Sequence, residues 1–526
     1  MVIYTQNDTI AAISTPVGTG GIGVVRISGG EALAVIQKIF TTTLKEKRLP
    51  EFEANKIYYG WIHECHSEGS EESSRIHSRE SLVSLRMKNL IDEVVLLCFN
   101  APNSFTGEDV FEIQCHGGVN VVKNILRLCL KSGARMAEQG EFSKRAFING
   151  KLDLSKAEAV IDLIHSKTDM FSKVSAMNLS GRLAEKISNL RNELMTLLSV
   201  ITAAVDFPEE VEEPEYAFVQ DRINFLIKEI ENILTGSVSS NLMRRGINVA
   251  IAGKPNVGKS SLFNALLDMQ RAIVTEIPGT TRDVIKESID IEGIPVTLID
   301  TAGLRELNDS SGADYIESIG INLTKEFLEN ADVVLYMHDL TRGISQEDIE
   351  TCKKIKNKLI KVGSKCDLTQ DSCEIPKQKG FSEMRSGSEY FSLVPDLEEP
   401  QVIEEITISE NRITDSQPTC RNCIKISSKT KAGLDELKAA IKNTVFSGSI
   451  TNMVDIEFST NLRQQERLKT CGEFLSKSLK ACQQGIPQDL FSIDLKSALI
   501  CLGEITGEVA SKEIIDNIFS KFCIGK

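Results

Sequence analysis

The sequence predicts a multidomain protein: an α+β N-terminal region, an α-helical bundle, and an α/β domain with a phosphate-binding loop inserted into that bundle. Three observations support this prediction. Strand and helix patterns mix through residues 1–151. A strand, a glycine-rich turn and a helix follow one another in residues 247–267. Helical spacing dominates residues 152–245 and 450–526, so these stretches either form one bundle interrupted by residues 246–449 or two independent helical segments.

The composition favours a folded protein and argues against a generally nucleic-acid-binding surface. At 526 residues and 41% hydrophobic residues, the chain has room for roughly three domains. A net charge of −14 excludes bulk attraction to nucleic acid, so any RNA contact needs a local basic patch or a basic partner. Thirteen scattered cysteines are typical of a reduced cytosolic protein. The N-terminus lacks a signal-peptide pattern and no long apolar run occurs, so we expect a cytoplasmic protein without a membrane segment.

The N-terminal region has an α+β pattern. Residues 9–27 place two apolar runs around a Pro- and Gly-rich loop, and residues 94–99 read as a strand. Residues 64–90 are polar and serine-rich, which is typical of a surface excursion or disorder. Cys115 and His116 could form a nucleophile pair, but two neighbouring residues are a weak signal, and a packing role at a strand end is favoured.

The central domain begins with a phosphate-binding loop. Residues Gly253 to Ser260, GKPNVGKS, fit the pattern G-x-x-x-x-G-K-[ST]. Glycines let backbone N–H groups surround a phosphate, and the positive end of the following helix points to the same place. Lys259 then supplies a charge to the outer phosphates, and the Ser260 hydroxyl can ligate Mg²⁺.

Two later motifs complete a phosphate and magnesium site. The turn Pro278-Gly279-Thr280-Thr281 puts hydroxyls near a second Mg²⁺ ligand position. The strand in residues 296–304 ends in Asp300-x-x-Gly303, where the carboxylate can hold Mg²⁺ through water and the glycine amide can meet a γ-phosphate. Leu304 follows this motif where Ras-type GTPases place a water-orienting Gln, so another group must position the attacking water.

The last motifs predict a preference for guanine. Ser364-Lys365-Cys366-Asp367 looks like the guanine-reading pattern [NT]-K-x-D with its first residue changed. Asp367 can accept two hydrogen bonds from guanine N–H groups, a donor pair that adenine lacks. A strand and a Ser-Ser-Lys loop follow in residues 423–437, and the five motifs in this order predict a GTP hydrolase. The candidate nucleotide contacts are Asn256, Val257, Gly258, Lys259, Ser260, Ser261, Thr275, Glu276, Ile277, Pro278, Gly279, Thr280, Thr281, Asp300, Thr301, Ala302, Gly303, Ser364, Lys365, Cys366, Asp367, Ser427, Ser428 and Lys429.

The cysteines between residues 366 and 423 suggest either a zinc site or an inserted surface loop. Cys420 and Cys423 form C-x-x-C, with Cys366 and Cys373 upstream, but zinc needs four ligands at suitable spacing. Residues 369–420 are polar, acidic and irregular, so an inserted surface loop is favoured.

Over nearly its whole length the chain resembles the MnmE (TrmE) family of tRNA-modification GTPases. The stretches that support this are DTIAAISTPVGTGGIGVVRISG, PNSFTGEDVFEIQCHGG, GEFSKRAFINGKLDLSKAEAVIDLI, GKPNVGKSSLFNALL, GTTRDV, DTAGLRE, LGEITGEV and the terminal FCIGK. The resemblance implies a tetrahydrofolate-binding and dimerising domain in residues 1–151, a helical domain in residues 152–245 and 450–526, and a GTPase domain in residues 246–449.

The family resemblance also implies a chemistry. It implies a homodimer that works with an FAD-containing partner, MnmG (GidA), and a 5-formyl or 5,10-methylene tetrahydrofolate to modify C5 of the wobble uridine of certain tRNAs. It implies that K⁺ replaces an arginine finger where two GTPase domains meet.

Individual residues match the family's functional positions. The folate contacts correspond to Arg26, Glu112, Lys151 and Lys526. The K⁺ ligands correspond to Asn256, Thr275, Ile277 and Thr280, and the Mg²⁺ ligands to Ser260 and Thr281. Glu317 matches the carboxylate that orients water, and Cys523 in FCIGK matches a cysteine that the family is suspected of using near the folate.

The sequence departs from the family pattern in three respects. Ser364 stands where Asn is expected, which removes a hydrogen bond to guanine worth on the order of 1 kcal/mol. The segment before Glu317 is longer than usual, and residues 64–90 and 369–420 are insertions. The alternative to an enzyme of tRNA modification is a GTP-regulated assembly or ribosome-associated factor without chemistry of its own, because one GTPase fold hosts many functions.

Overall fold

The computed structural model describes residues 8–42, 52–53, 55–64, 89–268, 286–300, 331–355, 358–369, 423–445 and 458–526. The chain divides into two compact units. The first unit comprises Met1–Arg244 together with Asn452–Lys526, and the second unit comprises Arg245–Thr451. Within the described residues, no helix is long and apolar enough to span a bilayer.

A mostly antiparallel sheet forms the N-terminal part of the first unit. Its strands are β1 (Ile10–Ile13), β2 (Ile22–Ser28), β3 (Phe40–Thr41), β4 (Ile57–His63), β5 (Leu90–Phe99), β6 (Val110–His116) and β7 (Arg135–Met136), in the order β3-β4-β5-β6-β2-β1-β7. Helices α1 (Ala32–Ile39) and α3 (Val119–Lys131) share a hydrophobic core with this sheet. Because side chains alternate along a strand, Val25 and Ile27 enter that core while Arg26 faces the opposite side.

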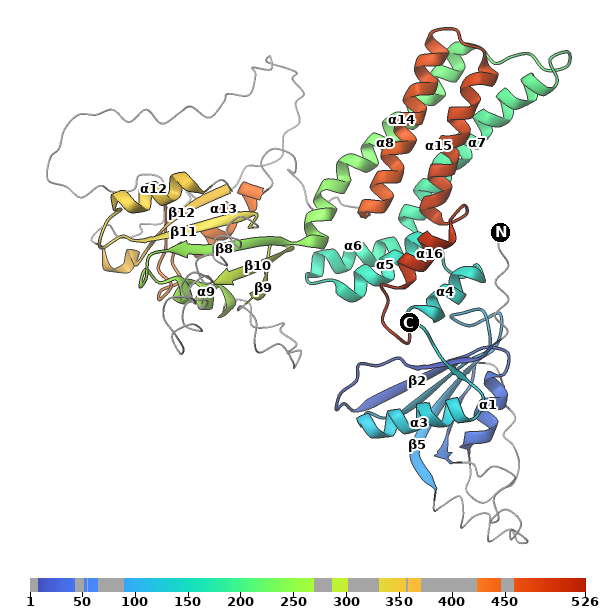
Figure 1. Ribbon diagram of the computed structural model, residues 1–526, viewed down its shortest axis with the longest axis horizontal. Helices are drawn as coiled ribbons and strands as arrows, with labels where there is room; N and C mark the ends of the chain where they lie inside the picture. Colours follow the sequence, from blue (N-terminus) through green and yellow to red (C-terminus); the bar gives the residue numbers. More distant parts are fainter. Residues whose placement is uncertain are drawn as a thin grey trace, which may run out of the picture. The chain divides into compact units, whose positions relative to one another are not determined.

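The helical part of the first unit is a bundle. Its helices are α5 (Leu154–His165), α6 (Asp169–Leu179), α7 (Arg182–Asp206), α8 (Tyr216–Arg245), α14 (Leu462–Gln483), α15 (Gln488–Thr506) and α16 (Lys512–Phe519). Figure 1 shows α7 and α8 beside α14 and α15, and buried residues of all four form one core. Helices that precede the second unit in the sequence therefore pack with helices that follow it, and the alternative of two independent helical segments is wrong.

The sheet and the bundle meet at α4 (Glu141–Ile148) and the C-terminal tail. Phe519 and Phe522 pack with Leu154 and with Phe147 of α4. A Cβ on Gly140, which has φ +65°, would lie 2.3 Å from the Phe519 carbonyl oxygen, so only glycine fits at this close approach. The tail then pairs with the N-terminal domain through a bridge between Gln139 and Ile524.

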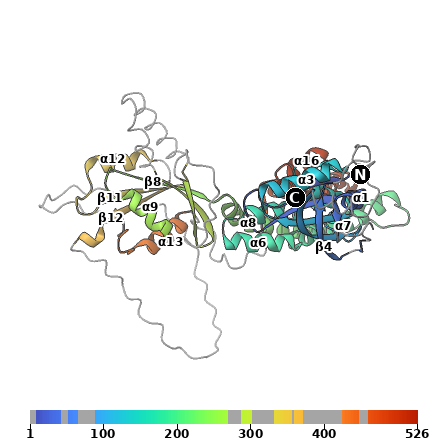
Figure 2. The ribbon, with the colours of Figure 1, turned by 90° about the horizontal axis from the view of Figure 1, so that it is seen from below.

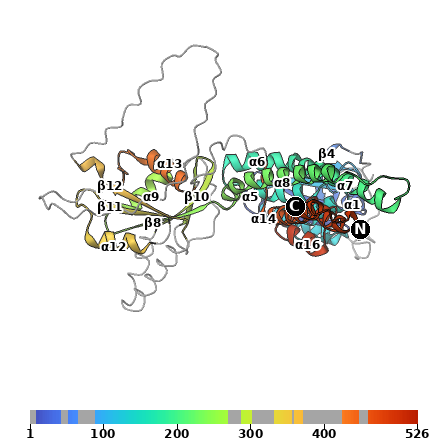
Figure 3. The same ribbon diagram turned by 90° about the horizontal axis from the view of Figure 1, so that it is seen from above.

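The second unit is an α/β fold around a mostly parallel sheet. The strands are β8 (Ile247–Gly253), β9 (Lys286–Ile291), β10 (Ile294–Asp300), β11 (Val333–Asp339), β12 (Lys358–Ser364) and β13 (Ile424–Lys425), in the order β13-β12-β11-β8-β10-β9, with only β9 antiparallel to its neighbour among the described strands. Helix α12 (Gln346–Lys354) covers one face, and α9 (Lys259–Asp268) and α13 (Leu434–Val445) cover the other (Figures 2 and 3). Parallel strands end at a common edge, which is where such folds bind ligands.

Candidate functional site

The phosphate-binding loop joins β8 to α9 in the predicted manner. Three of its residues have positive φ: Gly253 (+147°), Asn256 (+63°) and Gly258 (+97°). A Cβ on Gly253 would lie 2.4 Å from the Met337 carbonyl oxygen, so the loop can lie against β11 only with glycine there. Ser260 and Ser261 lie in the first turn of α9, whose positive end faces the loop.

Lys259 is largely buried within the loop that it serves. Its side-chain ammonium donates to the carbonyl oxygens of Gly253 at 3.0 Å and Lys254 at 2.8 Å. The side chain of Lys254 in turn donates to Ser345 at 2.7 Å and pairs with Glu347 at 2.9 Å, which ties the loop to the start of α12. The loop therefore carries a positive charge whose position is fixed by its own backbone.

The segment predicted to read guanine, Ser364 to Asp367, lies beside this loop. Strand β12 ends at Ser364, which is in register with Asp339 at the end of β11. The Ser364 hydroxyl lies 2.7 Å from the Val257 carbonyl oxygen and 3.1 Å from that of His338. The Ser364 side chain thus bridges the segment to the phosphate-binding loop.

Lys365 makes a second connection between the same two segments. Its ammonium donates to Asp339 at 2.7 Å and to the Asn256 carbonyl oxygen at 3.3 Å. Burial opposes the ionisation of Asp339, but hydrogen bonds from Lys365 and Thr341 outweigh it and hold its pKa below the usual range. Asp367, in the short 3₁₀ helix η2 (Cys366–Leu368), is exposed, so its carboxylate is accessible to a ligand.

The Ser-Ser-Lys loop after β13 joins the same edge of the sheet. The Ile426 amide donates to the Gly363 carbonyl oxygen at 2.8 Å, and the Cys366 amide donates to that of Ile426 at 3.2 Å. Ser427 is buried, whereas Lys429 is exposed. The structure therefore brings three of the predicted motifs together at the carboxyl edge of the parallel strands.

The other predicted nucleotide and metal residues lie mostly outside the described part of the chain. These are Thr275, Glu276, Ile277, Pro278, Gly279, Thr280, Thr281, Thr301, Ala302, Gly303 and Glu317. Asp300 ends β10 in register with Ile251 of β8, which places its backbone at the same edge.

A second cluster of predicted residues lies on the N-terminal sheet. Arg26 of β2 and Glu112 of β6 are cross-strand partners, and the guanidinium lies 2.8 Å from the carboxylate. The guanidinium also lies over the rings of Phe105 and Phe142, at 5.3 and 5.6 Å from their centroids. Taken singly in the sequence, Arg26 and Glu112 look like solvated charges, and it is the strand register that makes them a pair.

The C-terminal tail reaches this cluster. Arg26 donates to the Gly525 carbonyl oxygen at 3.4 Å, and Ser14 donates to the same oxygen at 3.1 Å. Gly525 has φ +93°, and a Cβ there would lie 2.2 Å from the Ile13 carbonyl oxygen. Cys523 is exposed, and Lys526 is partly exposed two residues after the exposed Ile524. The fourth predicted folate contact, Lys151, is exposed. Its side chain lies near Gly107, since a Cβ added to that glycine would be 3.5 Å from the Lys151 Cγ.

Cys115 and His116 do not form a nucleophile pair. The Cys115 thiol is buried and donates to the Gly23 carbonyl oxygen, and burial raises its pKa to about 11. His116 is exposed and lies 2.7 Å from Asp92. Adjacent residues of β6 point to opposite faces of the sheet, so the packing interpretation of Cys115 is confirmed.

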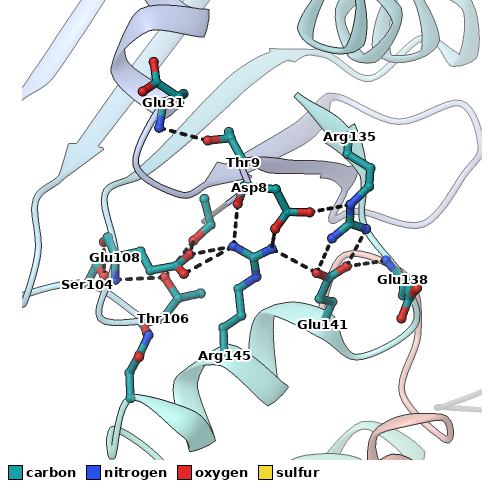
Figure 4. Close-up of polar contacts among 12 residues, drawn as sticks. Asp8, Thr9, Glu31, Ser104, Thr106, Glu108, Arg135, Glu138, Glu141 and Arg145 are labelled. Atoms are coloured by element: carbon teal, nitrogen blue, oxygen red, sulfur yellow. Dashed lines mark hydrogen bonds and ion pairs between the residues drawn. The ribbon is translucent and has the colours of Figure 1, made fainter. Parts of the chain in front are cut away.

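Sequence reasoning missed a partly buried network of charges around Arg145. Figure 4 shows Arg145 of α4 between Asp8, Glu108 and Glu141, with Nη2 2.7 Å from Asp8 and 3.0 Å from Glu141. Arg135 bridges Asp8 and Glu141, at 2.7 Å to each. Glu141 and Arg145 are only 3% and 4% exposed, and they line a cavity of about 620 Å³. The stretch GEFSKRAF gave no signal for this burial, because charged residues in a helical pattern are usually solvated.

Comparisons with known proteins cover nearly the whole chain. The family described as the MnmE helical domain matches residues 154–523, and the GTP-binding protein TrmE N-terminus matches residues 9–151. The tRNA modification GTPase MnmE of Desulforamulus reducens is 41% identical over 99% of this chain and 100% of its own length. Proteins of the same name from a Thermoanaerobacter species and from Clostridioides difficile are 39% and 38% identical, each over 99% of both chains.

Solved structures also match. They include Era in complex with MgGDPNP and a piece of 16S ribosomal RNA, which is 23% identical over 43% of this chain and 66% of that chain, at a TM-score of 0.24. Full-length identity of this order to several relatives, together with the two family matches, assigns the chain: it belongs to the MnmE family of tRNA modification GTPases.

Proposed function

We propose that this protein hydrolyses GTP and takes part in modifying C5 of the wobble uridine, position 34, of certain tRNAs. The observation that carries the proposal is the joint presence of a phosphate-binding loop and a guanine-reading segment, held together by the hydrogen bond from Ser364 to the Val257 carbonyl oxygen. The family name supports the tRNA reaction, because full-length relatives are called tRNA modification GTPases.

The proposed hydrolysis needs two cations. Lys259 and the positive end of α9 would hold the phosphates, and Ser260 with Thr281 would ligate Mg²⁺. We propose that Asn256, Thr275, Ile277 and Thr280 hold K⁺, which would stabilise the transition-state charge that an arginine finger stabilises in other GTPases. Glu317 would orient the attacking water. Asp300, at the end of β10, would hold Mg²⁺ through a water molecule.

The N-terminal cluster suits a tetrahydrofolate derivative, either 5-formyl or 5,10-methylene. A pterin ring offers adjacent N–H donors to a carboxylate, and Glu112 with its 20% exposed side chain is such an acceptor. Phe105 is 41% exposed beside the guanidinium of Arg26 and offers a flat apolar surface to a ring. Lys151 and Lys526 would attract the anionic glutamate tail of the folate. Cys523, on the C-terminal tail of the protein, has an exposed thiol.

The remaining elements of the proposal concern organisation. We propose functional domains at residues 1–151, 152–245 with 450–526, and 246–449. The first would dimerise, and the homodimer would work in the cytoplasm with an FAD-containing MnmG-type partner that also helps to bind tRNA. A net charge of −14 supports tRNA binding through such a complex, since this chain alone would repel polyanions.

The test is mass spectrometry of wobble uridine in tRNA from cells depleted of this protein. We expect the C5 modification to disappear and to return when the wild-type chain is expressed, but not with the Lys259→Ala variant. Unchanged modification on depletion would contradict the proposal and favour the assembly or ribosome-associated factor. Saturable binding of labelled folate by the full chain, weakened by Glu112→Gln, tests the one-carbon part separately.

A further inference from the structure

The first residue of the guanine-reading segment differs in this chain from the family pattern. Ser364 stands where the pattern has Asn, and its side chain is only 3% exposed. Its hydroxyl lies within hydrogen-bond distance of two backbone carbonyl oxygens, those of Val257 at 2.7 Å and His338 at 3.1 Å. Both contacts are with protein atoms, and one of them is part of the phosphate-binding loop.

The number of donors decides what Ser364 can do. A hydroxyl has one O–H donor, whereas an amide NH₂ has two. The N7 atom of guanine is a hydrogen-bond acceptor, so reading it requires a donor from the protein. An Asn at this position could donate to the loop carbonyl and to N7 at once, but the single proton of Ser364 is already shared between two carbonyl oxygens.

The neighbouring residue supports a role in holding the loop. Lys365 donates to the Asn256 carbonyl oxygen and to Asp339, so two consecutive side chains hold two consecutive carbonyl groups of the loop. Asp367 is different, because it is exposed and its carboxylate remains an acceptor for the N1–H and 2-amino groups of guanine.

We propose that Ser364 is a positioning residue that holds the phosphate-binding loop and makes no contact with the base. Guanine is then selected by Asp367, and its N7 atom is not read by a side chain. This inference rests on the proposed binding of a guanine nucleotide at this site.

Three nucleotides test the assignment by titration calorimetry on the full chain: GDP, 7-deaza-GDP, which lacks the N7 acceptor, and IDP, which lacks the 2-amino group. For the wild type we expect 7-deaza-GDP to bind within about twofold of GDP, and IDP to bind about tenfold more weakly, as expected for one lost hydrogen bond at a polar site. A penalty of fivefold or more for 7-deaza-GDP would overturn the assignment.

Variants at position 364 separate the two possible roles. Ser364→Ala should weaken GDP, 7-deaza-GDP and IDP by a common factor of about ten, because a buried carbonyl oxygen loses its donor. Ser364→Thr keeps the hydroxyl and should restore most of the affinity, which excludes misfolding as the cause. Ser364→Asn should create a new preference for GDP over 7-deaza-GDP of about fivefold. Ser288→Ala, at an exposed serine of β9, is the matched control and should change nothing.

The outcomes also separate this inference from the proposed function. If the wild type binds no guanine nucleotide, the proposed function itself is wrong. If it binds GDP tightly but Ser364→Ala behaves as wild type, or if Ser364→Asn does not discriminate against 7-deaza-GDP, then only the role assigned to Ser364 is wrong.

Discussion

At the scale of single residues, two backbone carbonyl groups of the phosphate-binding loop fix the position of the Lys259 ammonium. Its ammonium lies within 3.0 Å of two loop carbonyl oxygens, so its charge is placed before any phosphate arrives. A preplaced charge avoids the entropy cost of ordering a long side chain on binding. Lys254, two residues into the same loop, instead directs its side chain to α12.

Lys259→Ala should lower GTP affinity by about 100-fold or more, because charge-assisted hydrogen bonds to the outer phosphates are lost. Nucleotide titration of the purified variant measures this. Lys254→Ala is the matched control, since its ammonium pairs with Glu347 and should matter far less. Near-normal affinity of Lys259→Ala would show that another residue holds the phosphates.

Asp367→Asn should shift base preference from guanine toward xanthine by about tenfold or more, because the new amide donates where the carboxylate only accepted. Competition between GTP, XTP and ATP for the wild type and the variant measures the change. Binding of ATP as tightly as GTP by the wild type would mean that this segment does not read guanine.

At the scale of elements, largely buried charges join α4 to the N-terminal sheet region. Burial opposes the ionisation of Glu141, but hydrogen bonds from Arg135, the Glu138 amide and Arg145 lower its pKa below the ordinary 4.5. Burial likewise opposes the ionisation of Asp8, and its hydrogen bonds with Arg135 and Arg145 still leave its pKa lowered. A carboxyl with a lowered folded-state pKa stabilises the protein above its unfolded-state pKa, and this stabilisation is lost as pH falls toward the folded-state value.

Arg145→Met should destabilise the first unit by about 3–5 kcal/mol, since buried carboxylates lose their partner. Below about pH 4.5 the difference from wild type should shrink, because the carboxylates become neutral. Urea unfolding at several pH values, followed by the fluorescence of Trp61 in β4, measures both effects. Arg222→Met, which removes an exposed pair with Glu193, should cost less than about 1 kcal/mol, and an equal cost would contradict the burial argument.

Particular elements show how far the sequence could lead. The loop from β8 to α9 was predictable because its glycines and lysine are spaced by local backbone geometry. Periodicity marks an apolar face without naming what covers it, so the sequence does not decide whether the flanking helices share one core. The pair of Arg26 and Glu112 depends on strand register, and the Asp8–Arg145 contact joins residues far apart in the chain. The sequence predicts only that Ser364 loses a hydrogen bond to guanine. The two carbonyl partners of its hydroxyl, one on β11 and one on the phosphate-binding loop, depend on tertiary contacts.

At the scale of the whole molecule, the proposed hydrolysis requires positive charge in addition to that of Lys259 in the phosphate-binding loop. An arginine finger is worth about 10³ to 10⁵ in rate where one acts. Leu304 offers no polar group in place of Gln. A monovalent cation held by oxygen ligands around Asn256 could fill the same role, and its size would distinguish K⁺ from Na⁺.

Replacing Na⁺ by K⁺ at fixed ionic strength should raise the GTPase rate of the wild type about tenfold or more. Asn256→Ala should flatten this response while GTP binding remains, because Lys259 and the loop amides are intact. Glu317→Ala should lower the rate at every K⁺ concentration, since the role that we propose for Glu317 is to orient the attacking water and not to bind the cation. Steady-state phosphate release measures all three, and equal wild-type rates in both salts would direct attention to a residue supplied by a partner.

The division of the first unit into two segments has a consequence for how the chain stays folded. Arg244 and Asn452 belong to one unit, while the stretch between them, Arg245–Thr451, is a compact unit of its own. If that stretch were unfolded, it would be a flexible loop of roughly 200 residues. Closing such a loop when the bundle forms costs about 4–5 kcal/mol of chain entropy. While that stretch is folded, both of its connections to the first unit leave from one compact body, so closing the bundle costs less chain entropy. We therefore expect a nucleotide that stabilises the second unit against unfolding to stabilise the helical bundle as well.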